Sequence, residues 1–360
     1  MRGKGGTMTP SALRRRVLLS GTMLAAAVAG YGRRAYGGAT GGACVNSGGS
    51  TYQCSGAATV NVTPQAITAN NASVSTVAGF GVNTPTGNAI TITGDGALSY
   101  TDTNASPLTT TAAPGTSRAL RVVSGGNYLA TLGSVTINTN GALRGYSGIG
   151  AYNSGSGAIT VTANGNVTAT NSVNGIGINA FNSGLGVGTN VTVTTGAGTT
   201  VTGGSNGIAA SNYGTGALTV TANGNVTGLI GINATNLGAN LSVTTGAGTT
   251  VSGGAFGINA SNQYGSTGAV TITANGDVTG TANSGISATN NGTTLSVTTA
   301  ALTTVRGGNR GIYAHNYGTG ATLRQVRLAV PTGGGPTHFL TAFTPPCLAT
   351  SCWRTRSVST

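Results

Sequence analysis

The sequence predicts an all-β protein whose body is a right-handed parallel β-helix, a β-solenoid of roughly ten coils. Three observations lead to this prediction. A six-residue unit, Gly-Ile-x-Ala-x-Asn, recurs seven times, apolar and polar residues alternate between its copies, and Asn-Gly or Gly-Gly pairs follow the alternating stretches. Repeats of 20–50 residues that cannot bury an apolar face alone usually stack on one another.

The copies of this unit begin 24 to 30 residues apart, at Gly148, Gly177, Gly207, Gly231, Gly257, Gly285 and Gly311. Stacking places equivalent residues of successive coils about 4.8 Å apart. The isoleucines of the unit should therefore form one buried column, made of Ile149, Ile178, Ile208, Ile232, Ile258, Ile286 and Ile312. The asparagines that end the unit should form a corner ladder of amide hydrogen bonds, made of Asn153, Asn182, Asn212, Asn236, Asn262, Asn290 and Asn316.

Two alternating half-repeats lie between these units. One is Val-Thr-Ala-Asn-Gly-Asn-Val-Thr, as at 220–227, and the other is Val-Thr-Thr-Gly-Ala-Gly-Thr-Thr-Val, as at 243–251. Their period of two predicts strands rather than helices, and each unit should hold about three of them. Because a core of Val, Ile and Ala is narrow, we expect the five phenylalanines outside it or at its ends.

The positive charge is distributed unevenly along the chain. The formal net charge is +13, but residues 35–322 hold five arginines and three aspartates, which leaves the body at +2. The remaining charge lies in residues 1–34, with seven Lys or Arg, and in residues 323–360, with four Arg. Without a basic stripe to follow a phosphate backbone, the body is not expected to bind nucleic acid.

The organisation follows from composition. Residues 1–43 are predicted to be a signal peptide and leader, because a basic segment precedes an apolar run, 17–30, that is too short to span a membrane. Sec export is favoured, although Arg14-Arg15-Arg16 leaves a twin-arginine signal open. Residues 44–57 form a Cys-bounded N-terminal cap, 58–322 the β-helix repeats, and 323–360 a non-repeat tail.

The cysteines form two local pairs. Cys44 and Cys54 flank a Gly/Ser-rich loop after the export signal, so an oxidising compartment favours a disulfide over two free thiols. Zinc is disfavoured because neither pair has metal-ligand spacing and the two histidines are isolated. Whether Cys347 and Cys352 pair is left open.

The body lacks an obvious set of catalytic residues. Polysaccharide lyases and hydrolases share this fold and need paired carboxylates or a carboxylate-bound metal. The three acids are Asp95 and Asp277, which are interpreted as turn residues, and Asp102, which lies in a polar stretch without a partner nearby. We expect no enzyme activity, cofactor or metal, and keep a carbohydrate-active enzyme as an alternative.

Two surface patterns suggest other roles. Outward columns of Thr could order water, as in ice-binding solenoids, but unequal loop lengths are expected to break the flat array. A freestanding structural or ice-binding solenoid therefore remains an alternative. Tyr213, Tyr264 and Tyr317 would either form a sparse aromatic row for sugar or protein contact, or cover turn backbone. His315 fills a variable position of the repeat and is expected to be exposed.

The chain resembles passenger domains of bacterial autotransporters. The resemblance rests on the export segment 14–30, the Cys-bounded segment 44–56 and the Thr/Asn/Gly repeats, and it covers roughly residues 10–322. Similar repeats occur in filamentous haemagglutinin-like adhesins. The resemblance implies Sec export, display at the cell surface or outer membrane, or release from the cell. It also implies an adhesin-like or stalk role toward a host or neighbouring-cell protein or glycan.

One departure from the family concerns the C-terminal part. Such proteins end in a membrane β-barrel, and no such segment follows residue 322. The repeat stops at 320–323, where another Val-Thr-Ala-Asn-Gly coil is due, and prolines and cysteines follow. We expect a frameshifted or truncated product, which would remain periplasmic, with a short cap over the last coil as the alternative.

Overall fold

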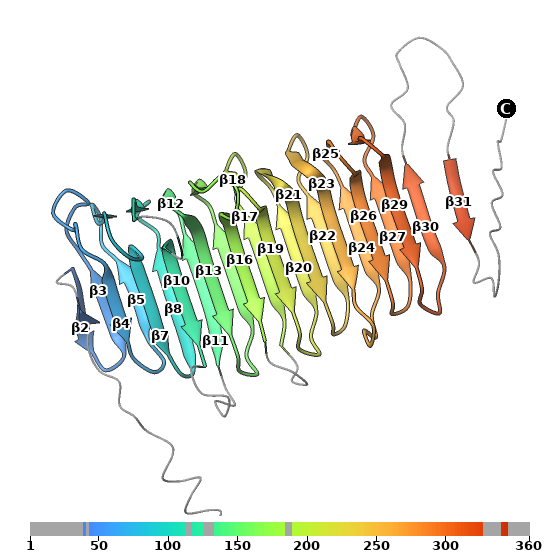
Figure 1. Ribbon diagram of the computed structural model, residues 1–360. Coiled ribbons are helices and arrows are strands. Elements are labelled where there is room, and N and C mark those ends of the chain that lie inside the picture. The colour runs from blue at the N-terminus through green and yellow to red at the C-terminus, as the bar shows by residue number, and fades with distance from the viewer. Residues whose placement is uncertain are drawn as a thin grey trace, which may run out of the picture. The chain divides into compact units, whose positions relative to one another are not determined.

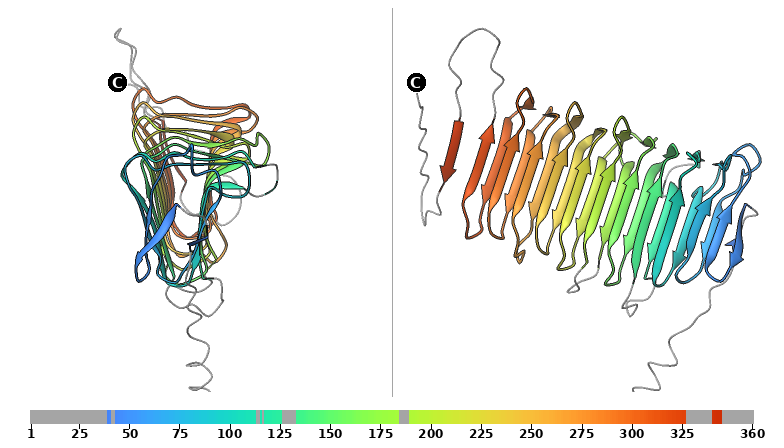
Figure 2. Two further views of the ribbon diagram at one scale, coloured as in Figure 1. Left: turned by 90° about the vertical axis from the view of Figure 1, so that its left-hand side faces the viewer. Right: turned by 180° about the vertical axis from the view of Figure 1, so that it is seen from behind.

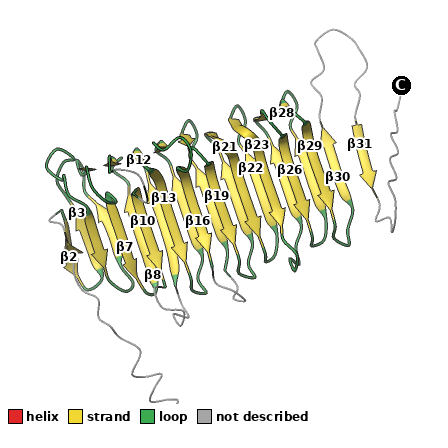
Figure 3. Ribbon diagram, viewed as in Figure 1, coloured by secondary structure: helices red, strands yellow, loops and turns green. Residues whose placement is uncertain are grey.

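A computed structural model describes residues 39–40, 43–112, 115, 117–125, 133–183, 189–326 and 340–344. The chain divides into two units, residues 1–37 and residues 38–360, and the described residues all belong to the second. They form strands, turns and loops without any helix (Figure 3). The strands stack in parallel as a β-solenoid of about nine turns, which confirms the predicted fold class (Figure 1). Most of the predicted signal segment and most of the tail, including His338, Cys347 and Cys352, lie outside the described residues.

Each coil contributes strands to three parallel ladders, as the half-repeats predict. The first ladder consists of β3 (Thr51–Cys54), β5 (Ser73–Thr76), β8 (Ala97–Asp102), β11 (Ser134–Thr139), β14 (Ile159–Ala163), β17 (Val191–Thr195), β20 (Leu218–Ala222), β22 (Leu241–Thr245), β24 (Val270–Ala274), β27 (Leu295–Thr299) and β30 (Thr322–Val326). The second consists of β6 (Val82–Thr84), β9 (Leu108–Thr110), β12 (Leu143–Gly145), β15 (Val167–Ala169), β18 (Thr200–Thr202), the first parts of β21 (Asn225–Asn236) and β23 (Thr250–Asn262), β25 (Asp277–Gly280) and β28 (Val305–Gly307). The third consists of β4 (Gln65–Thr68), β7 (Ile90–Gly94), β10 (Arg118–Ser124), β13 (Ser147–Asn153), β16 (Ile176–Asn182), β19 (Asn206–Asn212), the second parts of β21 and β23, β26 (Ser284–Asn290) and β29 (Arg310–Asn316). Because β21 and β23 continue through the corner, they join the second and third ladders into one sheet.

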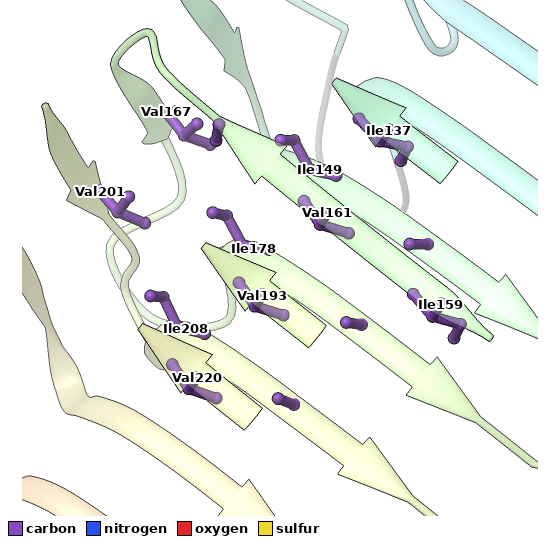
Figure 4. Close-up of a cluster of buried hydrophobic side chains, with 14 of the residues drawn as sticks. Ile137, Ile149, Ile159, Val161, Val167, Ile178, Val193, Val201, Ile208 and Val220 are labelled. Atoms are coloured by element: carbon purple, nitrogen blue, oxygen red, sulfur yellow. The ribbon is translucent and has the colours of Figure 1, made fainter. Parts of the chain in front are cut away.

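The predicted isoleucine column is present in the third ladder. Each of the seven isoleucines pairs in register with the next, from Ile149 opposite Ile178 to Ile286 opposite Ile312. All except Ile312 are fully buried. Figure 4 shows Ile149, Ile178 and Ile208 in one row, with valines of the first and second ladders turned toward them. Viewed from one end of the solenoid, the coils superpose around this interior (Figure 2).

The glycine that begins each repeat unit is explained by a close approach between coils. A Cβ atom on Gly207 would lie 2.8 Å from the carbonyl oxygen of Gly231 and 2.4 Å from a methyl carbon of Val226. The remaining glycines of the column, except the terminal Gly311, meet the same two kinds of neighbour. A side chain there would force the coils apart, and overpacking of this kind typically costs about 1–3 kcal/mol.

The alternation of the two half-repeats also has a physical cause. At one inward position of the first ladder, Thr and Ala alternate from coil to coil, in the order Ala163, Thr195, Ala222, Thr245, Ala274 and Thr299. The buried hydroxyl of Thr245 accepts hydrogen bonds from the backbone N–H groups of Asn275 and Gly276, at 3.0 and 3.1 Å. That of Thr195 likewise accepts from Gly224 at 3.2 Å. A threonine on one coil thus holds the Asn-Gly turn of the next.

The expectation of a narrow core made of Val, Ile and Ala is wrong for the first coils, where large aromatic side chains are buried. Tyr52, Phe80 and Tyr100 are all almost fully buried. In the first ladder Val74 lies between Tyr52 and Tyr100, so a small residue separates the two large rings. Alternation of large and small residues along the stack therefore makes room that a uniform column would not provide.

Both ends of the first ladder carry an antiparallel strand. At the start, β2 (Cys44–Gly48) forms a hairpin with β3, and β1 (Ala39–Thr40) pairs antiparallel with β4. At the other end β30 continues the parallel stack, and β31 (Leu340–Thr344) pairs antiparallel with it. The parallel array thus extends to Val326, a few residues beyond the end expected at 322. An antiparallel strand covers the edge that an unpaired parallel strand would expose.

Candidate functional site

The seven repeat asparagines line one corner of the solenoid. Six are fully buried, and Asn316 is partly exposed. Asn236 donates from Nδ2 to Oδ1 of Asn262 at 3.2 Å, Asn262 donates to Asn290 at 3.1 Å, and Asn290 donates to Asn316 at 3.0 Å. Their oxygens also accept from nearby backbone, as when Gly292 N–H donates to Asn290. The amides therefore fix the turn and link successive coils.

Two steps of this ladder have no amide–amide hydrogen bond, the step from Asn153 to Asn182 and the step from Asn212 to Asn236. Asn182 donates to Asn212 at 2.7 Å, but Asn212 gives its amide hydrogens to the carbonyl oxygens of Thr189 and Gly216, both at 3.0 Å. An amide NH₂ has two hydrogens, so the amide of Asn212 has none left to donate to Asn236. Oδ1 of Asn236 therefore has no hydrogen-bond partner among the described residues. Asn153 donates to the carbonyl oxygens of Gly155 and Gly157 in its own turn.

The cysteine pair at the start of the solenoid is joined. Cys44 and Cys54 lie directly opposite each other in the β2–β3 hairpin, with their sulfur atoms 2.03 Å apart. Both cysteines are buried. The cross-link closes a loop of ten residues over the first coil, and such a short loop restricts the unfolded chain by about 2–3 kcal/mol.

Asp102 is not isolated, contrary to the sequence-based expectation. Its carboxylate is fully buried and accepts hydrogen bonds from the Thr76 hydroxyl at 2.8 Å and from the N–H groups of Asn104, Ser106 and Gly141, each at 3.0 Å. These donors come from three successive coils. Hydrogen bonds to a charged acceptor are stronger than neutral ones, so Asp102 serves as a structural bridge between coils.

The other two aspartates lie apart from Asp102. Asp95 lies in the turn between β7 and β8, and Asp277 begins β25, six coils beyond β8 and thus roughly 30 Å away along the stack. Asp277 accepts from the Thr304 N–H at 2.7 Å, as Asn225 accepts from Thr250 two coils earlier. Among the described residues no three His, Cys, Asp or Glu side chains come together in a way that would hold a metal ion.

The outer face of the first ladder carries two columns of hydroxyl groups. One contains Thr136, Thr160, Thr192, Thr219, Ser242, Thr271 and Ser296, and the other contains Thr162, Thr194, Thr221, Thr244, Thr273 and Thr298. The five-residue register from β14 to β27 has no bulge. The expectation that unequal loops break this array is wrong, because the differences in length are confined to the turns.

The outer face of the third ladder is less uniform. One column runs through Thr91, Arg121, Gly150, Asn179, Ala209, Asn233, Asn259, Ser287 and Tyr313, and its neighbour through Thr93, Val123, Tyr152, Phe181, Ser211, Thr235, Ser261, Thr289 and His315. Ring-bearing or cationic side chains occur only near the two ends of these columns. The central coils carry small polar residues and Ala there.

Arg118, Arg121 and Tyr152 form what we term the Arg–Tyr cluster, at the N-terminal end of this face. The guanidinium carbons of Arg118 and Arg121 lie 5.4 and 5.7 Å from the centre of the Tyr152 ring. Partial burial lowers the pKa of Arg121, and the nearby charge of Arg118 lowers it further. The next coils supply Asn179, which donates to the Tyr152 hydroxyl at 3.1 Å, and Phe181, whose ring centre lies 5.6 Å from that of Tyr213.

A second group of rings lies at the C-terminal end of the third ladder. Arg310 lies over Tyr313 at 4.9 Å, and the rings of His315 and Tyr317 are 4.0 Å apart. His315 is exposed, and Tyr317 has 65% of its surface exposed. Tyr264 is 91% exposed. Tyr213 contacts Phe181, so the three tyrosines of the sequence-based prediction lie in different surroundings.

Sequence reasoning missed the Arg–Tyr cluster because its members come from two strands with different motifs. Arg118 and Arg121 precede the first complete Gly-Ile-x-Ala-x-Asn unit, and Tyr152 lies within it. A signal was nevertheless present, since Gly150 stands where later copies have Asn, Ala, Ser or Tyr. A Cβ atom on Gly150 would lie 2.7 Å from both Cδ of Arg118 and a ring carbon of Tyr152.

Comparisons with known proteins give no relative. No family model matches the sequence, and neither the curated proteins nor the solved structures contain a match. In the part of the chain that the structure describes, no helix is long and apolar enough to span a membrane.

Proposed function

We propose that this protein is a non-catalytic, exported rod of the autotransporter-passenger type, with an adhesin-like or stalk role outside the cytoplasm. The observation that carries the proposal is a nine-turn parallel solenoid that begins with a disulfide-closed hairpin. Disulfides persist in oxidising compartments and are rare in the cytosol. Sec export, and a cell-surface, outer-membrane or extracellular location, are parts of the same proposal.

The distribution of side chains supports a role in contact rather than catalysis. The interior is filled by apolar columns and hydrogen-bonded amides. The three aspartates serve turns or bridge coils, and they lie at separate places along the stack. Variation between coils is concentrated in outward positions of the third ladder, where a partner would make contact. Solenoids use such extended faces for binding.

Export can be tested by expressing the full chain, and a matched chain that lacks residues 1–30, in a Gram-negative host. We expect the full chain outside the cytoplasm with a shortened N-terminus and with Cys44 and Cys54 protected from alkylation. The shortened chain should stay in the cytoplasm with both thiols reactive. Retention of the full chain in the cytoplasm at its original length would contradict the proposal. Replacing Arg14 and Arg15 by lysine separates the two routes, because only twin-arginine export requires that pair.

The proposed lack of catalysis has its own test. We expect no turnover of polysaccharides by the purified chain. Turnover that is lost in Asp102→Asn, Asp95→Asn or Asp277→Asn, with folding retained, would support the carbohydrate-active enzyme instead.

A second candidate function is supported by the two hydroxyl columns of the first ladder. Their unbroken register gives a regular array with strand spacings of about 4.8 Å between coils, and a regular array of hydroxyl groups is the kind of surface that orders water. A freestanding ice-binding solenoid would show thermal hysteresis, and Thr221→Tyr in the centre of the array would abolish it. The Thr and Ser residues on the outer face of the third ladder are not part of this surface, so Thr235→Tyr is the matched control.

A further inference from the structure

The outer face of the third ladder departs from its repeat pattern over three consecutive coils. At the two outward positions of β10, β13 and β16, these coils carry Arg121, Tyr152, Asn179 and Phe181, whereas the next four coils carry only Ala, Asn, Ser and Thr. The inward residues Leu120, Ile149 and Ile178 of the same three strands stay aliphatic and in register. Packing of the core therefore explains the residue types at the inward positions. The unusual residue types at the outward positions of β10, β13 and β16 require another explanation.

The cluster brings positive charge together instead of spreading it. Both guanidiniums lie against one ring, and the pKa of Arg121 is lowered by partial burial and by Arg118. The carboxylates of Asp102 and Asp277 accept hydrogen bonds elsewhere in the solenoid, and Asp95 lies in the turn between β7 and β8. Two crowded cations would be stabilised by a ligand that brings negative charge between them.

The surroundings of these charges define the ligand further. Guanidinium groups bind carboxylates through paired N–H donors. The ring of Tyr152 and the adjoining pair Phe181 and Tyr213 offer an apolar surface for the C–H groups of a sugar. The amide of Asn179 and the hydroxyl of Thr91 flank this surface. From Arg121 to Phe181 the site spans two coil steps, about 10 Å, which is enough for two linked sugar rings.

We propose that the Arg–Tyr cluster is a binding site for acidic saccharides, with a carboxylate held between Arg118 and Arg121 and a sugar ring placed against Tyr152. The site deepens the proposed adhesin-like function and rests on it. The two remain separable, since export is measured by cell fractionation and this site by binding to the purified chain.

Gly150 is a positioning residue of this site. It leaves the space that Arg118 and Tyr152 occupy, and its backbone is extended without a positive φ, so alanine fits the strand itself. In Gly150→Ala the new methyl group would displace the Arg118 side chain and the Tyr152 ring, which both lie on the outer face. This substitution changes the site while preserving every charge.

The test uses the purified full chain and three probes: a soluble oligogalacturonate, the same oligomer with its carboxylates methyl-esterified, and inorganic phosphate. Binding is measured by titration calorimetry at low salt. We expect the free acid to bind at least about tenfold more tightly than the ester. Competition by phosphate at equal concentration would show a general anion site and would overturn the saccharide assignment.

Four variants distinguish the site from general charge effects. Arg121→Gln and Tyr152→Ala should each weaken binding by about tenfold or more, and Gly150→Ala should weaken it measurably. Arg144→Gln is the matched control, because Arg144 is an exposed arginine of β12 in the second ladder. Thermal unfolding of every variant checks the fold.

Three results would overturn the proposal: no binding of the free acid by the parent chain, equal loss in Arg121→Gln and Arg144→Gln, or full binding by Tyr152→Ala. If one of these variants unfolds, Arg121→Lys is a second variant that tests the same binding site. It keeps the charge and removes the paired donors, and it should weaken binding without altering the dependence on salt.

Discussion

The first coils and the central coils of the solenoid use the same backbone in different ways. From β19 to β27 the coils are nearly interchangeable, with aliphatic columns inside and Ala, Asn, Ser or Thr at the outward positions of the first and third ladders. From β8 to β16 the interior accepts Tyr100 and the charged Asp102, and the exterior carries Arg121, Tyr152 and Phe181. The residue types that recur in the central coils are those that the solenoid needs in order to fold. Residues of the first coils that differ from them are not needed for folding.

The largest expected effect tests whether the interior column is continuous. Ile258→Ala in the central coils removes a fully buried side chain and should lower the free energy of unfolding by about 2–5 kcal/mol. Ile312→Ala, in the last coil of the same column, removes a partly exposed side chain and should cost less than about 2 kcal/mol. Urea unfolding monitored by circular dichroism measures both. Equal losses would mean that the column is not the common core.

An intermediate effect compares the inner and outer amides of one strand. Asn262→Ala leaves the amide of Asn236 and the oxygen of Asn290 without their ladder partner inside the protein, and it should cost about 1–3 kcal/mol. Asn259 also donates to an asparagine one coil earlier, Asn233, at 3.0 Å, but on the half-exposed outer face. Asn259→Ala should change stability by less than about 0.5 kcal/mol. The contrast fails if the two variants unfold at the same urea concentration.

The smallest expected effect has the opposite sign and belongs to the first coils. The Tyr100 hydroxyl is buried without a hydrogen-bond partner among the described residues, so Tyr100→Phe should stabilise the fold by about 1 kcal/mol at neutral pH. Burial raises the pKa of this phenol well above its usual value, and the Asp102 carboxylate raises it further. The unfolded chain therefore releases this proton near pH 10 while the folded chain keeps it, and stability falls as the pH rises through that point.

Unfolding measurements between pH 7 and pH 11 check this prediction. The parent chain should lose stability above about pH 10, and Tyr100→Phe should lose less. A variant that is less stable than the parent at neutral pH would indicate that the hydroxyl has a partner, such as a buried water molecule.

The regular part of the fold is predictable from sequence because each column repeats one residue type. Seven isoleucines and seven asparagines at similar spacing define their registers, and the structure contains both columns. The interruption between Asn212 and Asn236 is not predictable, since it depends on which carbonyl oxygens lie near one amide. The burial of Tyr52 and Tyr100 also depends on the small Val74 between them, which pairs with both only after folding.

The Arg–Tyr cluster was beyond sequence reasoning for a related reason. Arg118 and Tyr152 are 34 positions apart in the chain, and no motif joins them. They meet because β10 and β13 pair in one particular register and because Gly150 has no side chain. A repeat predicts which residues stack, whereas a binding site arises where the repeat is not followed.

The threonine whose hydroxyl accepts hydrogen bonds from the next coil's Asn-Gly turn limits how the number of coils can change in evolution. Because Thr and Ala alternate at that position, a duplication or deletion of a single coil would bring two threonines or two alanines together and leave a turn unsupported. Recombination between copies two coils apart preserves the alternation of Thr and Ala. Viable descendants should therefore differ in length by pairs of coils, each pair lengthening or shortening the molecule by about 10 Å.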